Sequence, residues 1–136
     1  MEFNKASAKF ISILHKEHSK YINETLKDEG LSFGLTPLLA MIYENEGINQ
    51  EKLAEALYLN ESTITRNLKK LEDEELIERI KDKRKKIMKV TPKGEKLALK
   101  ILDYEYQWDE KLKKCLTNEE YDNFLKNLKK ICEKLI

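Results

Sequence analysis

The chain has 136 residues, 38% of them charged and 40% hydrophobic, and its formal net charge is +1. This length favours one domain with a single core, and the composition is typical of a soluble, helix-rich chain. No secretory segment and no apolar run of about eighteen residues is present, so we expect a cytoplasmic protein with no membrane partner. The two cysteines, Cys115 and Cys132, form no CxxC pair, which fits reduced thiols.

The first part of the chain predicts two helices. Apolar side chains recur at helical spacing between Phe3 and Leu26, so we expect one long helix there. Thr36 and Pro37 open a second helix that is apolar nearly all round, which predicts burial. Gly47 suits the position just after the end of this second helix.

A helix-turn-helix pattern follows. Asn49 and Asn60 are each suited to cap a helix N-terminus, because the side-chain oxygen can accept a free backbone N–H of the first turn. Only a tight turn fits between the two helices, although the usual turn glycine is missing. In the second helix Ile64, Leu68 and Leu71 form one apolar stripe that predicts a buried face.

The opposite face of that second helix carries hydroxyl and basic side chains. Hydroxyls near a helix N-terminus, followed by cations, can read base edges and hold phosphates. The candidate DNA-binding residues on this face are Ser62, Thr63, Thr65, Arg66 and Lys69. A solvated amphipathic helix shows the same pattern, so this face alone does not decide the function.

A strongly basic hairpin comes next. Apolar residues flank a segment whose bases are Arg79, Lys81, Lys83, Arg84, Lys85, Lys86 and Lys89, against the single acid Asp82. Like charges at a hairpin tip repel one another, which indicates a polyanionic partner. We expect Lys83, Arg84, Lys85 and Lys86 to bind DNA, with Asp82 orienting the Arg84 guanidinium.

The rest of the chain predicts two more helices with long apolar stripes. Thr91 and Pro92 open one, and Thr117 with Glu120 forms a capping box at the start of the other. The last stripe continues to Ile136, and such stripes exceed what a small domain can cover by itself. An ordinary helical core would give the same spacing, but we expect a dimer interface built from the first and last helices.

Other chemistry is weakly supported. His15 and His18 could form half of a metal site, yet no second pair of ligands is evident, so we expect structural histidines, no metal and no cofactor. Cys115 and Cys132 lie on apolar stripes, and redox sensing by either one stays open. No catalytic constellation is recognisable, so we do not expect an enzyme.

Several segments resemble the MarR (multiple antibiotic resistance regulator) family of transcription factors. They are Leu35-Thr36-Pro37, Leu53-Ala54-Glu55, Ser62-Thr63-Ile64-Thr65-Arg66, Leu71-Glu72, Asp82-Lys83-Arg84 and Val90-Thr91-Pro92-Lys93-Gly94-Glu95. The resemblance implies a homodimer, often a repressor, with the second helix in the major groove and the wing in the minor groove. One departure is that lysines, Lys85 and Lys86, follow where the family often places a second arginine.

The resemblance also implies a small phenolic or anionic effector bound between the dimer helices and the DNA-binding lobe. Candidate lining residues are Tyr21, Phe33, Tyr43, Tyr104, Tyr106 and Trp108, although core packing explains most of these rings equally well.

We therefore expect a mainly α fold with a small antiparallel β-wing, in one domain over residues 1–136. The winged helix-turn-helix covers residues 35–95, and dimerisation helices cover residues 1–28 and 96–136. The expected function is a transcriptional regulator that binds a pseudo-palindromic operator in double-stranded DNA as a homodimer. The alternative is a winged-helix protein–protein module whose basic wing binds an acidic partner.

Overall fold

The computed structural model describes residues 2–136, apart from the side chain of Asp82. Its elements in chain order are η1 (Phe3–Lys5), α1 (Ser7–Leu26), η2 (Lys27–Glu29), η3 (Phe33–Leu35), α2 (Thr36–Glu44), α3 (Gln50–Leu57), α4 (Glu61–Asp73), β1 (Ile77–Asp82), β2 (Lys85–Val90), α5 (Pro92–Lys113) and α6 (Asn118–Leu135). The η elements are single 3₁₀ turns. The prediction of a mainly α fold with a small antiparallel wing is confirmed.

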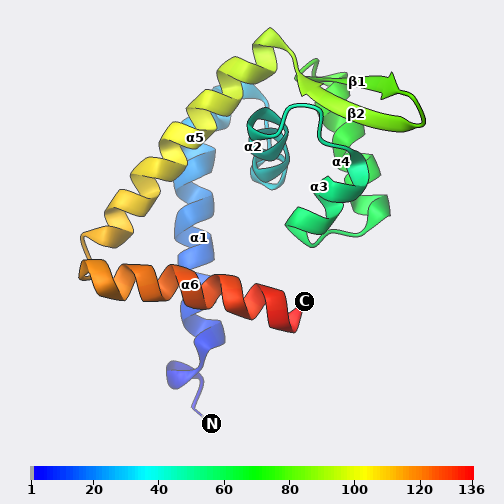
Figure 1. Cartoon of the computed structure of the whole chain (residues 1–136). Helices are drawn as coiled ribbons and strands as arrows, with labels where there is room; N and C mark the ends of the chain where they lie inside the picture. The colour runs from blue at the N-terminus through cyan, green and yellow to red at the C-terminus, as the bar shows by residue number, and fades with distance from the viewer. Residues whose placement is uncertain (1) are drawn as a thin grey trace.

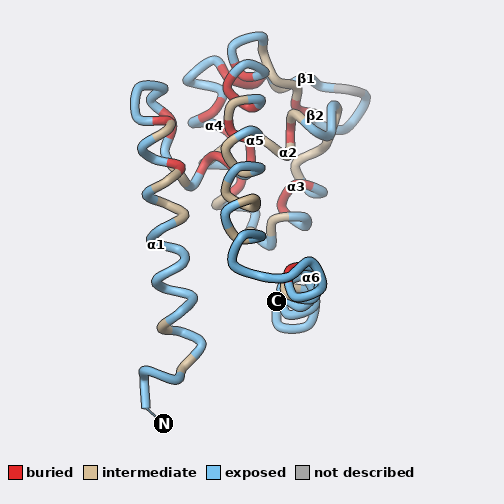
Figure 2. The backbone as a smooth tube through the Cα atoms, turned by 90° about the vertical axis from the view of Figure 1, so that its left-hand side faces the viewer, coloured by how far each residue is buried: buried red, intermediate tan, exposed pale blue. Residues whose placement is uncertain are grey.

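The molecule has a compact lobe and a helical frame (Figure 1). The lobe holds α2, α3, α4 and the β1–β2 hairpin, and it contacts the N-terminal half of the long helix α5. Helix α1 runs alongside α5, whereas α6 turns away after the end of α5. Figure 2 shows α6 standing apart from the lower half of α1.

The core lies in the lobe and where the lobe meets the frame (Figure 2). Its fully buried large side chains are Ile22, Leu26, Leu38, Leu39, Ile42, Leu53, Ile64, Leu68, Leu71, Met88 and Ile101. Helix α1 contributes only its last turns to this core, and Tyr121 is the one buried residue of α6. Most of the apolar surface of both terminal helices is therefore exposed.

The first helix is shorter than the sequence predicts. Residues Phe3–Lys5 form a separate 3₁₀ turn, and Ala6 has extended backbone angles, φ −80° and ψ 139°. Helix α1 begins only at Ser7, with no side chain capping it. An alanine cannot accept the free N–H groups of a first turn, so the apolar spacing before it did not extend the helix.

The end of the second helix also differs from the prediction. Asn45 ends α2, so Gly47 lies one residue beyond the position expected for it. Its φ of 83° is in the left-handed region that favours glycine. The Gly47 N–H donates to the Met88 carbonyl at 3.3 Å. Gly47 therefore turns the chain toward the hairpin rather than closing the helix.

The start of α5 is fixed against the turn between α4 and β1. The Thr91 hydroxyl accepts from the Gly94 N–H at 3.0 Å and donates to the Glu75 carbonyl at 2.6 Å. The Thr91 N–H donates to the Leu76 carbonyl at 3.0 Å. Gly94 is buried directly against Leu76, where a Cβ would overlap the Leu76 carbonyl oxygen. This contact sets the direction in which the long helix leaves the lobe.

The capping box predicted for α6 is confirmed. The Thr117 hydroxyl accepts from the Glu120 N–H at 3.1 Å, and the Glu120 carboxylate accepts from the Thr117 N–H at 2.8 Å. The Thr117 backbone hydrogen bond, followed by the hydroxyl, lowers the pKa of Glu120 below its ordinary value of 4.5. The local signal alone therefore fixes where α6 begins.

Candidate nucleic-acid interface

Helix α4 has the two faces that its sequence predicts. Ile64, Leu68 and Leu71 are each 0% exposed and face the lobe. The Asn60 side chain accepts from the Thr63 N–H at 2.8 Å and caps the helix. On the other face Ser62, Thr65, Arg66 and Lys69 are exposed, and Thr63 is half-buried. Burial of one stripe therefore leaves the hydroxyl and basic groups facing solvent.

The turn between α3 and α4 is made without glycine. Tyr58 takes the left-handed conformation, with φ 54° and ψ 39°, at the end of α3. The next N–H, that of Leu59, donates back to the Ala54 carbonyl at 3.0 Å and closes the helix end. The sequence pattern predicted a tight turn here, and the structure shows which residue bears its unfavourable backbone angle.

The hairpin is a regular antiparallel pair whose tip is basic. Ile77 pairs with Val90 at its base, and the register continues to the pair of residues 82 and 85. Met88 is fully buried and anchors β2 on the lobe. The candidate DNA-binding residues Lys83, Arg84, Lys85 and Lys86 are all exposed. The predicted orienting role of Asp82 concerns a side chain outside the described residues.

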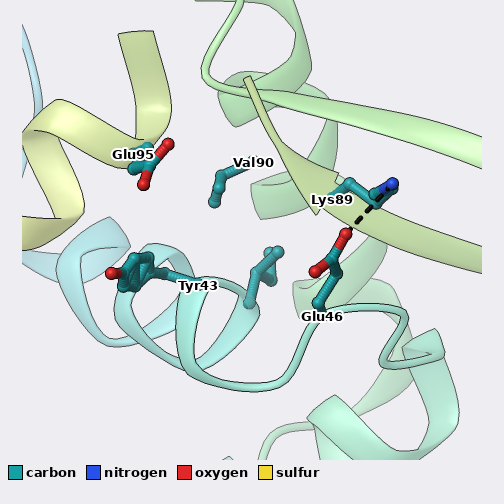
Figure 3. Close-up of a pocket in the computed structure, with 6 residues that line it drawn as sticks. Tyr43, Glu46, Lys89, Val90 and Glu95 are labelled. Carbon is teal, nitrogen blue, oxygen red and sulfur yellow. Dashed lines mark ion pairs between the residues drawn. The ribbon is translucent and has the colours of Figure 1, made fainter. Parts of the chain in front are cut away.

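Two other bases of the hairpin pair with acids of neighbouring elements. Lys89 Nζ lies 3.0 Å from a Glu46 carboxylate oxygen (Figure 3), and Arg79 Nε lies 3.7 Å from a Glu72 oxygen. Both bases belong to the basic segment of the sequence, but in the structure they tie the hairpin to the loop after α2 and to α4. Among the described side chains, the four tip bases have no ion-pair partner.

The hairpin is also joined to the loop that precedes α3. Asn49 and Ile87 form an isolated antiparallel bridge, and the Met88 N–H donates to the Ile48 carbonyl at 3.0 Å. A hollow of about 250 Å³ separates the N-terminus of α3 from the hairpin tip, lined by Asn49, Gln50, Glu51, Arg84, Lys85 and Lys86. The tip and the helix-turn-helix are therefore one connected surface.

Two hydroxyls of α4 make polar contacts that the sequence did not predict. The Gln50 side-chain nitrogen donates to Thr65 Oγ1 at 2.8 Å, which joins α3 to α4. The Ser62 hydroxyl donates to Asn60 Oδ1 at 2.8 Å. Gln50 gave no local signal, because its partner lies fifteen residues away on another helix.

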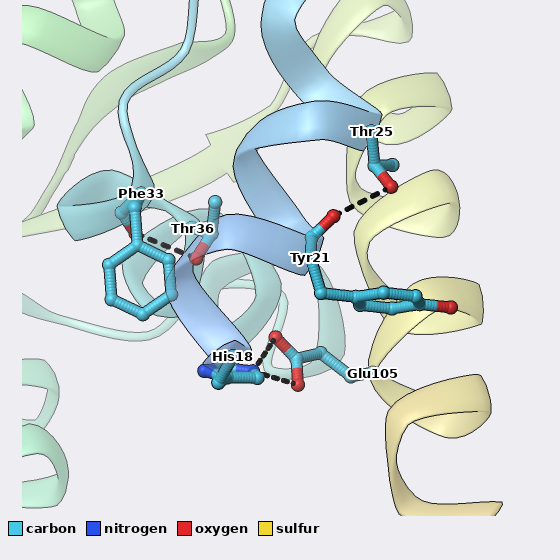
Figure 4. Close-up of polar contacts among 6 residues, drawn as sticks. All are labelled: His18, Tyr21, Thr25, Phe33, Thr36 and Glu105. Carbon is cyan, nitrogen blue, oxygen red and sulfur yellow. Dashed lines mark hydrogen bonds and ion pairs between the residues drawn. The ribbon is translucent and has the colours of Figure 1, made fainter. Parts of the chain in front are cut away.

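The aromatic residues proposed to line an effector site are brought together only in part. The rings of Phe33 and Trp108 lie 5.3 and 5.0 Å from the His18 ring, between α1, α5 and η3. The rings of Tyr104 and Trp108 each lie 6.0 Å from the Tyr21 ring, which extends this cluster. Figure 4 shows His18, Tyr21 and Phe33 of the cluster. Both Glu105 oxygens lie within 3.0 Å of His18 Nε2. The other two predicted rings lie elsewhere: Tyr43 borders a separate hollow beside Lys89 (Figure 3), and Tyr106 is 63% exposed.

A cation also faces this aromatic cluster. Lys111 Nζ lies 4.1 Å from the centre of the Tyr21 ring. Burial, followed by the nearby Tyr104, raises the pKa of the Tyr21 hydroxyl.

Among the described residues, no group of three or more His, Cys, Asp or Glu side chains could hold a metal ion. Cys115 is exposed and Cys132 is half-buried, and both are free thiols.

An apolar groove opens between the terminal helices and α5. Its volume is about 440 Å³, and its lining includes Ile11, Leu14, Trp108, Leu125 and Leu128. These side chains continue into exposed apolar faces on α1 and α6, where Ile11 is 64% and Leu125 is 55% exposed. Such a continuous apolar surface is typical of an interface that another chain covers.

A capped helix-turn-helix followed by an attached basic hairpin defines a winged helix-turn-helix protein. The chain matches the MarR family over residues 36–86. It is 32% identical over 127 residues to the HTH-type transcriptional regulator BilQ of Clostridium symbiosum (strain WAL-14163), a match that covers 91% of this chain and 88% of that protein. It is 44% identical over 78 residues to the uncharacterized HTH-type transcriptional regulator YybA of Bacillus subtilis (strain 168), covering 55% of this chain and 52% of that one.

Solved structures show the same relationship. A MarR-family transcriptional regulator of Listeria monocytogenes in complex with 26mer DNA superposes with a TM-score of 0.85 and 28% identity, covering 96% of this chain and 89% of that one. The crystal structure of MarR gives a TM-score of 0.77 with 29% identity, covering 99% and 94%. The chain belongs to the MarR family of transcriptional regulators, which are not enzymes. No helix in the described part of the chain is long and apolar enough to span a membrane.

Proposed function

We propose that this chain is a sequence-specific regulator that binds a pseudo-palindromic operator in double-stranded DNA as a homodimer and represses transcription. The observation that carries the proposal is the exposed face of α4, with Thr65, Arg66 and Lys69, beside the exposed bases of the hairpin tip. The hydroxyls and Arg66 would read base edges in the major groove, while Lys69 and the tip would hold phosphates or enter the minor groove. The complex of the Listeria monocytogenes relative with DNA supports this use of the fold.

The apolar surface left exposed by the fold supports the proposed dimer. Both terminal helices expose apolar faces that the chain itself does not cover, and the groove between them and α5 has room for side chains of a second copy. Two recognition helices would then lie about 34–36 Å apart and enter successive major grooves. Repression needs only that the bound dimer occupy a promoter, so we propose it as the sign of regulation.

The DNA proposal is tested by titrating salt against affinity for an operator, selected from random duplexes, and for a scrambled duplex. Arg84→Ala should weaken both complexes and reduce the slope of log K against log salt by about one per subunit. Arg84→Lys keeps the charge, so it should retain the slope and lose only the part of the affinity that depends on the flat guanidinium. Lys114→Ala, which removes an exposed charge at the far end of α5, is the matched control and should change neither.

The outcome separates the two functions expected from the sequence. No binding of any duplex would contradict DNA recognition and favour a protein–protein module that uses its wing on an acidic partner. If Arg84→Ala leaves the affinities and the slope unchanged, the wing does not touch DNA.

The dimer is tested by sedimentation. Deletion of residues 117–136, or the milder Leu128→Asp, should give a monomeric or aggregating chain with much weaker operator binding, whereas Lys126→Ala on the same helix should stay dimeric. A Leu128→Asp protein that sediments as a dimer would show that α6 is not in the interface.

We further propose that a small phenolic or anionic effector releases the DNA. The aromatic cluster around His18 supports this proposal, because its rings and the Lys111 cation could receive an aromatic anion. Trp108 is the single tryptophan of the chain, so its fluorescence reports binding directly. Benzoate should quench or shift this emission and lower operator affinity in the wild type, and Tyr21→Ala should weaken both effects. Benzoate that leaves emission and affinity unchanged would contradict a site for an aromatic anion in this cluster.

A further inference from the structure

We propose that Gln50 is a positioning residue for sequence recognition: it holds Thr65 so that the Thr65 hydroxyl acts as a hydrogen-bond donor toward a base. The inference rests on the proposed function, in which α4 enters the major groove, and it adds the direction of the contact that one hydroxyl makes. Gln50 itself lies outside the recognition helix, in the first turn of α3.

In the structure the Gln50 amide is the donor of this hydrogen bond. The Gln50 side-chain nitrogen lies 2.8 Å from Thr65 Oγ1, and an amide nitrogen has only protons to offer. One lone pair of the Thr65 oxygen is therefore occupied, while its own proton remains available. Accepting a hydrogen bond also polarises the O–H group and strengthens it as a donor. Thr65 is exposed, so this proton is accessible to a group outside the chain.

This is the single side chain–side chain hydrogen bond between α3 and α4 in the described part of the chain. Gln50 is half-buried and follows the capped N-terminus at Asn49, whose side chain accepts from the Lys52 N–H at 2.8 Å. The amide therefore projects from a helix end whose position is fixed by its cap. The hydrogen bond from Gln50 on α3 therefore restricts the rotation of the Thr65 hydroxyl on α4.

Ser62 on the same face has the opposite polarity. Its oxygen lies 2.8 Å from Asn60 Oδ1, an amide oxygen that can only accept, so the Ser62 proton is already used. Ser62 can offer only lone pairs to an outside group. The two hydroxyls, although chemically alike, are therefore set for different partners by side chains that do not themselves belong to the exposed face of α4.

The base preference follows from the groups displayed in the major groove. Guanine presents the acceptors O6 and N7 and thymine presents O4, whereas cytosine presents only the N4 amino donor. Adenine presents both an acceptor, N7, and the N6 amino donor, so a donating Thr65 favours guanine or thymine at the position it reaches, tolerates adenine and disfavours cytosine. One hydrogen bond of this kind corresponds to about 2- to 10-fold in affinity.

The test selects operators from a random duplex pool with the wild type and with each variant. Thr65→Val keeps the shape of the side chain and removes the hydroxyl. The operator position at which this variant loses the preference for guanine or thymine is therefore the base pair that Thr65 contacts. Gln50→Ala should reduce the preference at this same position and leave the others unchanged. Thermal melting of each variant checks that the fold is retained.

Gln50→Glu tests the direction of the bond. A carboxylate can only accept, so Thr65 would have to donate to it and would show the DNA a lone pair instead. The preference should move away from guanine and thymine toward cytosine, which presents only an amino donor, whereas adenine presents both kinds of group and should change little. Ala56→Glu adds the same charge at an exposed position of α3 without touching Thr65, and it should lower affinity through charge alone, with the base preference unchanged.

The outcomes separate this inference from the function on which it rests. A wild type that selects no operator overturns DNA recognition itself. A wild type that selects an operator, with Gln50→Ala and Gln50→Glu leaving the Thr65 position unchanged, overturns only the role of Gln50. A Thr65→Val protein that selects the same sequence as the wild type overturns it equally, because Thr65 would then read no base.

Discussion

Replacement of Gly94 by alanine should damage the joint between the DNA-binding lobe and the long helix. Gly94 lies in the first turn of α5, where helix propensity alone would make alanine more stable by about 1 kcal/mol. The structure predicts the opposite sign. A Cβ at this position would overlap the Leu76 carbonyl oxygen and lie 2.9 Å from the Leu76 carbonyl carbon, and backbone atoms cannot rotate away as a side chain could.

The magnitude follows from what must move. To relieve the overlap, α5 has to shift away from the turn between α4 and β1, which stretches the Thr91 N–H bond to Leu76 and the Thr91 hydroxyl bond to Glu75, now 3.0 and 2.6 Å long. Two such bonds correspond to about 1–3 kcal/mol and the overpacking itself to about 1–3 kcal/mol. The higher helix propensity of alanine offsets about 1 kcal/mol of this, so we expect a net loss of about 1–5 kcal/mol.

The assay is urea unfolding of Gly94→Ala beside Gly34→Ala. A Cβ at Gly34 meets nothing within 4 Å, so that control should change stability by no more than about 0.5 kcal/mol. Gly94→Ala should also bind the operator more weakly, because the lobe would leave the long helix at a different angle and the half-site spacing would change. If both variants unfold at the same urea concentration, the close approach of Gly94 to Leu76 is not a constraint on the fold.

Three further predictions concern stability. Leu68→Ala should lower the free energy of unfolding in urea by about 2–5 kcal/mol, because Leu68 is 0% exposed and its loss leaves a cavity between α4 and the lobe. Lys69→Ala, at the neighbouring exposed position, should change little. Unchanged stability of Leu68→Ala would mean that this face is not packed. Tyr58→Gly should raise the free energy of unfolding by about 1 kcal/mol, because glycine adopts the left-handed conformation at this position, φ 54°, without strain. A clear loss of stability would show that packing of the half-exposed Tyr58 ring stabilises the fold by more than the backbone strain costs. Glu120→Ala should lower the thermal midpoint at neutral pH. The difference from the wild type should shrink as the pH falls below 4.5, because a carboxylate with a lowered pKa stabilises the fold only while it is ionised. A difference in midpoint that stays the same in acid would contradict the capping box as its source.

Elements with a local signal were predictable from the sequence. The caps at Asn49, Asn60 and Thr117 each need only a side chain and backbone groups three residues away, so the sequence placed the starts of α3, α4 and α6. The buried stripe of α4 follows from helical spacing in the same way. The start of α1 was predicted too early, because the apolar spacing continues through Ala6. The backbone at Ala6 is extended and its side chain cannot cap a helix, so α1 begins only at Ser7.

The contacts that shape the candidate interface depend on the tertiary structure. Lys89 pairs with Glu46 and Arg79 with Glu72 only because the hairpin folds back onto the loop after α2 and onto α4, and these pairs leave the tip bases as the exposed ones. Gln50 and Gly94 gave no signal of their own, since each acts on a residue of another element. Sequence determines local hydrogen bonds and periodicity, whereas the distance between two elements is decided only when the core packs them together.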